Sequence, residues 1–271
     1  MQKAFLYGAN VHANGIRQHY IRYGGKGPVI VLVPGITSPA VMWGFVADEL
    51  AADYDVYVLD VRGRGLSAGG ADLDYSLNAC AADINAFIGE LGLRDVIGLG
   101  HSMGARHLVR AAHQGKIQRL LLVDPPVSGP GRRPYPATLA SYVEAIALAR
   151  HGATIDDLRR FTPTWSDEEI RLRTEWLHTC HEAAVIASFY GFQEDDIHQD
   201  IAALRVPTSL VTAERGGVVS SEDIDEIKSL CPGIHVTTIA NAGHMIPWDN
   251  LPGFLIQVRG FLKEGVGFNA A

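Results

Sequence analysis

Short apolar runs alternate with longer amphipathic segments along most of the chain. The runs are rich in branched side chains and leucine, are bounded by Gly, Pro or Asp, and cover residues 29–33, 54–59, 96–99, 120–123, 208–212 and 235–239. Helices are predicted at residues 77–91, 103–113 and 221–230, and Ser220 suits the N-cap of the last one. Strands that alternate with helices predict a parallel sheet covered by helices on both faces.

The alternation stops between residues 124 and 205. A stretch rich in Pro and Gly follows Asp124, and three or four helical segments come after it with no convincing strand among them. The strand pattern resumes at Val206-Pro207. We therefore predict a core formed by residues 1–126 and 206–271, with a helical cap or lid inserted at residues 127–205. Residues 265–271 are predicted to form a frayed tail.

Composition narrows the kinds of partner. The 271 residues are 47% hydrophobic and carry a net charge of -7, so we expect a small-molecule partner rather than nucleic acid or a membrane surface. Three widely spaced cysteines predict free thiols in a reducing compartment. The N-terminus has no apolar signal segment, and the prediction is a cytoplasmic protein. The sequence carries no signal for an oligomeric state.

Gly100-His-Ser-Met-Gly104 matches the G-x-S-x-G pattern of a nucleophile elbow, in which a serine lies on a sharp turn between a strand and a helix. A predicted strand precedes it and a predicted helix follows it, so we predict Ser102 to be a nucleophile. Dinucleotide binding is a rival, because Gly98-x-Gly100 also opens a helix. Met103 stands where the third glycine of that motif belongs, which makes the rival unlikely.

His244 is the candidate base. It follows the last predicted strand, between a glycine and Met-Ile-Pro, and a histidine in such a loop can reach the serine across the sheet edge. The plain alternative is one more surface histidine among the 11 in the chain.

The acid of the triad is not at its usual place. In the common arrangement it follows the strand before the histidine, where this chain has Gly216-Gly217. Asp124 follows the strand after the elbow helix and is our first candidate, and Glu214 is the second. The alternative for Asp124 is a turn-forming residue at the start of the insertion.

Three further segments contain candidates for a functional role. Ile36, in the loop after an early strand, and Met103 are predicted to supply the backbone N–H groups of an oxyanion hole, worth about 3 kcal/mol each. The Asp60 to Ser67 segment lacks the lysine of a phosphate loop and is interpreted as a structural turn. His178 and His181 have metal-like spacing, but packing or pocket lining is favoured over zinc.

Together these segments resemble the α/β-hydrolase superfamily over nearly the whole chain, which implies a mostly parallel eight-stranded sheet flanked by helices, with a helical cap. Three segments look more narrowly like the N-formylmaleamate deformylases of bacterial nicotinic-acid degradation: 33–39, 124–133 and 175–180. In that family the triad acid follows the sixth strand, which corresponds to Asp124. Pro34 departs from the wider superfamily, where a histidine is common.

The resemblance implies hydrolysis of the N-formyl group of N-formylmaleamate to maleamate and formate through a formyl-Ser102 intermediate. No metal and no cofactor are expected. Arg132 or Arg133 is predicted to bind the carboxylate of this small anionic amide. The same triad suits a carboxylesterase, a carbon–carbon hydrolase or a perhydrolase, and a ligand receptor without activity is an alternative of another class.

Overall fold

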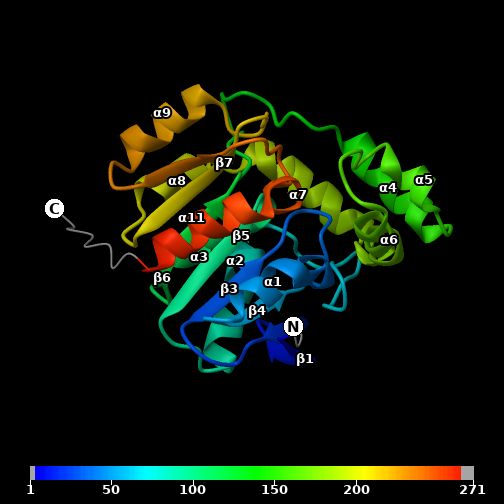
Figure 1. The fold of residues 1–271 in the computed structure, drawn as a ribbon, viewed down its shortest axis with the longest axis horizontal. Coiled ribbons are helices and arrows are strands. Elements are labelled where there is room, and N and C mark those ends of the chain that lie inside the picture. Colours follow the sequence, from blue (N-terminus) through cyan, green and yellow to red (C-terminus); the bar gives the residue numbers. More distant parts are fainter. Residues whose placement is uncertain (1–3, 264–271) are drawn as a thin grey trace.

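An eight-stranded sheet runs through the middle of the molecule (Figure 1), in the order β1-β2-β4-β3-β5-β6-β7-β8. The computed structural model describes residues 4–263, so the tail predicted at 265–271 lies outside the described residues. β2 is antiparallel to both of its neighbours, and the strands from β4 to β8 are parallel. The strands are β1 (Phe5–Ala13), β2 (Ile16–Tyr23), β3 (Val29–Val33), β4 (Asp55–Leu59), β5 (Val96–His101), β6 (Ile117–Val123), β7 (Thr208–Ala213) and β8 (His235–Ile239).

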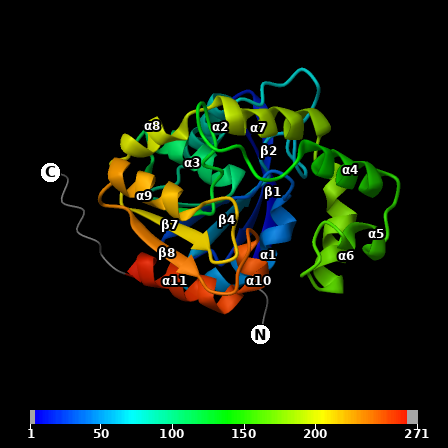
Figure 2. The same ribbon diagram turned by 90° about the horizontal axis from the view of Figure 1, so that it is seen from above.

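Helices cover both faces of the sheet (Figure 2), which confirms the predicted fold class. α2 (Leu77–Glu90), α3 (Met103–Ala112), α8 (Ile197–Ala202) and α9 (Ser221–Leu230) lie on one face, and α1 (Gly44–Leu50) and α11 (Leu251–Lys263) lie on the other. The central strand β3 is apolar throughout because both of its faces are buried, and its four residues from Ile30 to Val33 are fully buried. No helix within residues 4–263 is long and apolar enough to cross a membrane.

The hairpin of β1 and β2 is absent from the six predicted apolar runs. β1 lies at the sheet edge, and most of its side chains are exposed or half-buried. The turn between the two strands is Asn14-Gly15, with φ of 50° and 74°. Two successive residues with positive φ are typical of a type I′ hairpin turn, so this dipeptide was the local signal for the hairpin.

The segment between β6 and β7 holds five α-helices, where the sequence predicted three or four. Figure 1 shows α4, α5 and α6 grouped at one end of the molecule. α8 packs against α3 and α9 of the core layer, while the division at residues 127–205 remains a prediction. The first four helices of the segment are α4 (Leu139–Arg150), α5 (Ile155–Arg159), α6 (Asp167–Trp176) and α7 (Glu182–Glu194).

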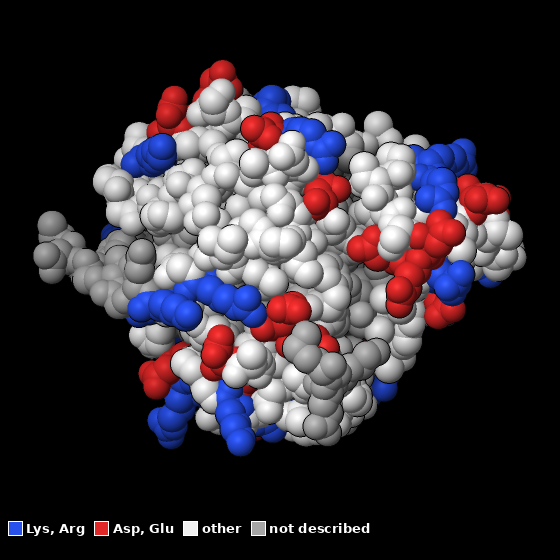
Figure 3. Space-filling model, viewed as in Figure 1, with Lys and Arg blue, Asp and Glu red and all other residues white. Residues whose placement is uncertain are grey.

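Acidic and basic side chains lie next to one another at the end formed by α4 to α6 (Figure 3). Arg160 pairs with Glu144 at 2.7 Å, and Arg159 pairs with Asp167. Exposed pairs of this kind contribute little stability, but they leave these two arginines with a local carboxylate partner.

Close contact between α3 and the end of β3 fixes the position of the elbow. A Cβ added to Gly104 would lie 2.0 Å from the carbonyl oxygen of Val33, and one added to Gly100 would lie 2.6 Å from the Ala105 backbone. Backbone atoms cannot yield as a flexible side chain can, so only glycine fits at these two positions.

We expect the Gly104→Ala variant to lose about 2 kcal/mol or more of unfolding free energy, because the methyl group overlaps the β3 backbone. Gly260→Ala is the matched control. Gly260 lies in α11 with no atom within 4 Å of an added Cβ, so alanine should stabilise the helix by about 0.5–1 kcal/mol. Urea unfolding measures both values, and equal stability of the two variants would contradict the packing argument.

Candidate active site

Ser102 occupies the sharp turn between β5 and α3. Its backbone has φ 53° and ψ -120°, a region that non-glycine residues rarely adopt. The Ser102 N–H donates a 2.8 Å hydrogen bond to the carbonyl oxygen of Val123, at the end of the neighbouring strand β6. The strained turn therefore presents the hydroxyl at the carboxyl ends of the central strands, as a nucleophile elbow requires.

His244 lies in the loop between β8 and α10 (Ile246–Asp249). Its Nε2 is 3.0 Å from Ser102 Oγ, and its Nδ1 is 2.7 Å from Asp124 Oδ2. With the Nδ1–H donated to the carboxylate, Nε2 is free to accept the serine proton. The loop predicted to reach the serine across the sheet edge thus brings the imidazole within hydrogen-bond distance of it.

Asp124 is the carboxylate that contacts His244. It follows β6 directly, is fully buried, and donates its backbone N–H to the Val211 carbonyl oxygen at 2.8 Å. Its φ of 44° turns the chain so that the carboxylate lies beside the elbow. Glu214, the second candidate, instead accepts the Asn241 N–H at 2.7 Å in the exposed turn after β7.

His101 holds the backbone of the candidate base, His244, through a hydrogen bond. Its Nε2–H donates to the carbonyl oxygen of His244 at 2.9 Å, and the two rings are 4.8 Å apart. Burial, with the neighbouring His244 as a smaller cause, lowers the pKa of His101 to about 3. The ring therefore stays neutral and holds the His244 backbone without placing a second positive charge beside the base.

The loop after β3 lies against the elbow. A Cβ at Gly35 would be 3.4 Å from Ser102 Cβ, which puts the Ile36 N–H in the neighbourhood of the hydroxyl. The buried Arg64 bonds the Ile36 carbonyl oxygen at 3.1 Å and contacts Met103 Sδ at 3.4 Å, so one side chain joins both predicted oxyanion donors. Met103 begins α3, and its N–H has no carbonyl one turn earlier to bond.

The segment from Asp60 to Ser67 forms a turn that supports this loop. Asp60 accepts the backbone N–H groups of Ala40 at 2.6 Å and Leu66 at 3.0 Å, and its carboxylate also contacts His19 at 2.7 Å. These contacts match the interpretation of the segment as a structural turn.

A cavity of about 250 Å³ opens above Ser102. Its lining comes partly from the loops after β3, β5 and β8 and partly from the segment between β6 and β7, so a molecule inside it would contact both parts of the chain. Its lining comprises Gly35, Ile36, Thr37, Ser38, His101, Ser102, Tyr142, Phe161, Thr162, Trp165, Arg173, His244 and Met245.

The two arginines predicted to bind a substrate carboxylate do not line this cavity. Arg132 pairs with Glu226 at 2.5 Å, and Arg133 pairs with Asp223 at 2.7 Å and also bonds two backbone carbonyls. Both partners lie on α9, so the arginines attach the start of the insertion to the core. Their role in carboxylate binding stays a prediction, which these ion pairs and their absence from the cavity lining do not favour.

Sequence reasoning missed the polar cap residues that face Ser102. Arg173 lies on α6, on the same buried side as Ile170, and Tyr142 lies on α4. A single arginine on the apolar side of a helix was the available signal for Arg173. Tyr135 was also missed; its hydroxyl lies 3.1 Å from that of Tyr142 and interacts with Ser102, while burial raises its pKa well above the ordinary value.

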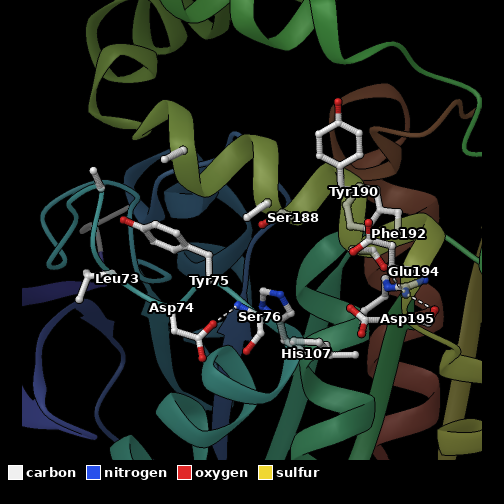
Figure 4. Close-up of a pocket in the computed structure, with 16 residues that line it drawn as sticks. Leu73, Asp74, Tyr75, Ser76, His107, Ser188, Tyr190, Phe192, Glu194 and Asp195 are labelled. Carbon is white, nitrogen blue, oxygen red and sulfur yellow. Dashed lines mark hydrogen bonds between the residues drawn. The ribbon is translucent and has the colours of Figure 1, made fainter.

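A larger cavity of about 570 Å³ lies beside α7 (Figure 4). Its serines have structural partners: Ser76 caps α2, and Ser188 bonds the Ala184 carbonyl oxygen at 2.8 Å. Burial is the main cause that lowers the pKa of His107 in its wall to about 3. The smaller cavity is the candidate active site because it contains Ser102 and His244 within hydrogen-bond distance of each other.

Of the two histidines with metal-like spacing, His181 takes part in packing and His178 is exposed. His181 precedes α7, where its backbone N–H donates to the Gly63 carbonyl oxygen at 2.8 Å and its ring stacks on Tyr75. Among residues 4–263, no group of three or more His, Cys, Asp or Glu side chains is arranged to hold a metal ion.

Sheet order, elbow and serine–histidine–aspartate contacts together define the class of protein. Residues 30–256 match the alpha/beta hydrolase family, and the chain belongs to that family.

One relative is similar over almost the full length. An N-formylmaleamate deformylase of Pseudomonas putida KT2440 is 59% identical over 262 residues, which cover 96% of this chain and 98% of the relative. A crystal structure of a variant N-formylmaleamic acid deformylase from Pseudomonas putida S16 is 55% identical, has a TM-score of 0.90, and covers 93% of this chain and 100% of its own.

A more distant structure supports the fold alone. The crystal structure of an E-2-(acetamidomethylene)succinate hydrolase is 22% identical, with a TM-score of 0.78 over 95% of this chain and 99% of its own.

We expect Asp124→Asn to lower kcat about a thousand- to ten-thousand-fold, because the amide no longer favours the His244 tautomer that accepts the serine proton. Glu214→Gln is the matched control and should keep near wild-type turnover. Steady-state kinetics with a common substrate compares the two variants. Loss of turnover in Glu214→Gln with retention in Asp124→Asn would reverse the assignment.

Stability should fall in mild acid because His101 and His107 are buried and neutral. Both have a pKa of about 3 when folded, against an ordinary value of 6.5, so the unfolded chain binds more protons below pH 6.5. Their contribution is complete above pH 6.5 and is lost as the pH falls toward 3, by about 1.4 kcal/mol per pH unit for each histidine.

Urea unfolding between pH 6 and 4.5 measures this slope. His107→Gln removes one of the two groups, and its slope should be about 1.4 kcal/mol per pH unit shallower than that of the wild type. Parallel slopes for the two proteins would refute the role given to His107.

Proposed function

We propose that this chain hydrolyses N-formylmaleamate to maleamate and formate, with Ser102, His244 and Asp124 as its catalytic triad. The observation that carries the proposal is the 59% identity to a deformylase of that name over nearly all of both chains. The serine–histidine–aspartate contacts support it, because they supply the nucleophile and base that amide hydrolysis needs.

The first step is attack on the formyl carbon. Ser102 Oγ forms the new C–O bond while His244 Nε2 takes the serine proton across the 3.0 Å contact. The positive charge that develops on the imidazole is stabilised by the Asp124 carboxylate, 2.7 Å from Nδ1. The formyl oxygen becomes negative, and the backbone N–H groups of Ile36 and Met103 stabilise it.

The second step breaks the C–N bond. The negative oxygen reforms its carbonyl, and His244 donates its proton to the departing nitrogen, so maleamate leaves as a neutral amide and formyl-Ser102 remains. This nitrogen is a good leaving group because it stays conjugated to the second carbonyl of the substrate. That conjugation makes an N-formyl amide easier to cleave than an ordinary peptide bond.

Water completes the cycle. His244 removes a proton from a water molecule that attacks the formyl carbon, and the same oxyanion donors stabilise the second tetrahedral intermediate. Collapse of this intermediate breaks the C–O bond to Ser102, which takes its proton back from His244, and formic acid is released. Formic acid then gives its proton to solvent water and becomes formate.

The cavity suits a small substrate. Its volume of about 250 Å³ lies below the common range of drug-sized sites, about 300–1,000 Å³. A single-carbon acyl group occupies little of this space, which leaves room on the leaving-group side for the four-carbon maleamate.

We expect the purified protein to release one formate per N-formylmaleamate consumed, measured by a coupled formate assay. Ser102→Ala should lower the rate about a million-fold, because the nucleophile is absent while the fold is retained. A short aryl ester serves as the comparison substrate for the carboxylesterase alternative. Rapid ester hydrolysis without formate release from N-formylmaleamate would refute the deformylase proposal.

A further inference from the structure

Arg173 is a buried cation in the wall of the candidate active site. It is 8% exposed and lines the cavity that contains Ser102 and His244. Among the described residues it has no carboxylate at ion-pair distance, and its Nε has no hydrogen-bond partner. Burying an unpaired charge is costly, so a side chain kept in this state calls for a partner supplied from outside the chain.

The other buried arginines without a carboxylate have more hydrogen-bond partners within the protein than Arg173 has. Arg106 donates to four backbone carbonyl oxygens at 2.8–3.1 Å. Arg64 donates to three backbone carbonyls and to the Ser188 hydroxyl. Arg173 has only two contacts, both 3.3 Å long and both to Thr37. Guanidinium groups have five N–H donors, so Arg173 keeps more unused donors than Arg106 and Arg64, which each make four such hydrogen bonds.

A second polar atom in the cavity wall is also without a partner. The hydroxyl of Thr162 is buried, has no hydrogen-bond partner among residues 4–263, and belongs to the same cavity lining as Arg173. His101 Nδ1, in the same lining, is a third unpaired atom, but a neutral imidazole nitrogen without a proton is an acceptor. Buried hydroxyls are nearly always hydrogen-bonded, so an unpaired guanidinium Nε and an unpaired hydroxyl in one cavity lining indicate a shared polar ligand that accepts hydrogen bonds.

An aromatic pair lies beside Arg173. Its Cζ lies 5.7 Å from the ring of Trp165, which stacks on Trp248 at 4.9 Å. This surrounding is apolar and largely excludes water, so an ion pair formed here would be stronger than one at the surface. Burial lowers the pKa of Arg173, which agrees with a charge that lacks its counter-ion.

We propose that Arg173, assisted by the Thr162 hydroxyl, binds the carboxylate of the substrate and makes the enzyme selective for acyl amides that carry a carboxylate on the leaving-group side. This inference rests on the proposed function for the reaction at Ser102. A planar guanidinium matches a carboxylate through two parallel hydrogen bonds. Arg173 is thus proposed for the carboxylate-binding role that the sequence suggested for Arg132 and Arg133, whose guanidinium groups are paired with carboxylates on α9.

The kinetic test compares two cis substrates that differ in one group: N-formylmaleamate and N-formylisocrotonamide, in which a methyl group replaces the carboxylate. Arg173→Met should lower kcat/KM for N-formylmaleamate about 10- to 100-fold, as expected for charged hydrogen bonds, and leave kcat/KM for the isocrotonamide within about twofold. Arg173→Lys keeps the positive charge but cannot form two parallel hydrogen bonds to a carboxylate, so its kcat/KM for N-formylmaleamate should fall less than that of Arg173→Met. Arg133→Met is the matched control and should keep wild-type selectivity.

A purely structural role gives a different result. Arg173 also bonds Thr37, beside the oxyanion donor Ile36, so general damage to that loop would slow both substrates equally. Equal losses for the two substrates would overturn the proposal.

Binding measured without turnover separates this inference from the proposed function. Calorimetry on Ser102→Ala should detect maleamate, and adding Arg173→Met should weaken its binding about 10- to 100-fold. Absence of maleamate binding to Ser102→Ala, or equal binding to both proteins, would refute the Arg173 assignment. Absence of formate release by the wild type, together with Arg173-dependent maleamate binding, would instead refute the deformylase reaction alone.

Discussion

The contact between the start of α3 and the end of β3 is the constraint on which the site depends. Gly104 lies so close to the Val33 carbonyl that no side chain fits between them, and this approach forces Ser102 into a backbone region with φ of 53°. Such a conformation costs about 1–3 kcal/mol and persists only where packing enforces it. The strain has a use, because it places the hydroxyl above the strand ends where groups from neighbouring strands can reach it.

Strand register then explains the position of the acid. His101 pairs with Val123 across β5 and β6, so Ser102 and Asp124 are the next residues on two adjacent strands. Both have positive φ, and each backbone N–H donates to a carbonyl oxygen of the next strand, that of Val123 in β6 or Val211 in β7. A carboxylate here is one strand from the serine, and the loop after β7 has no need to supply one.

Sequence reasoning succeeded where local pattern determines structure. Buried parallel strands are continuous apolar runs, and the elbow has glycines at fixed spacing, so both could be predicted. The edge strand β1 is mostly exposed and lacks such a run, although Asn14-Gly15 marks its turn. The choice of Arg173 over Arg132 and Arg133 depends on how α6 packs above the sheet. No local pattern shows which arginine already has a carboxylate partner.

Arg173 also connects substrate binding to the oxyanion loop. Arg173 donates both of its hydrogen bonds to Thr37, the residue after Ile36. Arg64, in the turn from Asp60 to Ser67, donates to the Ile36 carbonyl oxygen. The loop is thus held between a cap arginine and a core arginine. A carboxylate bound by Arg173 would fix that side chain, and with it the loop, before Ser102 attacks. Binding energy from a group remote from the reaction would then help to position the donors that stabilise its transition state.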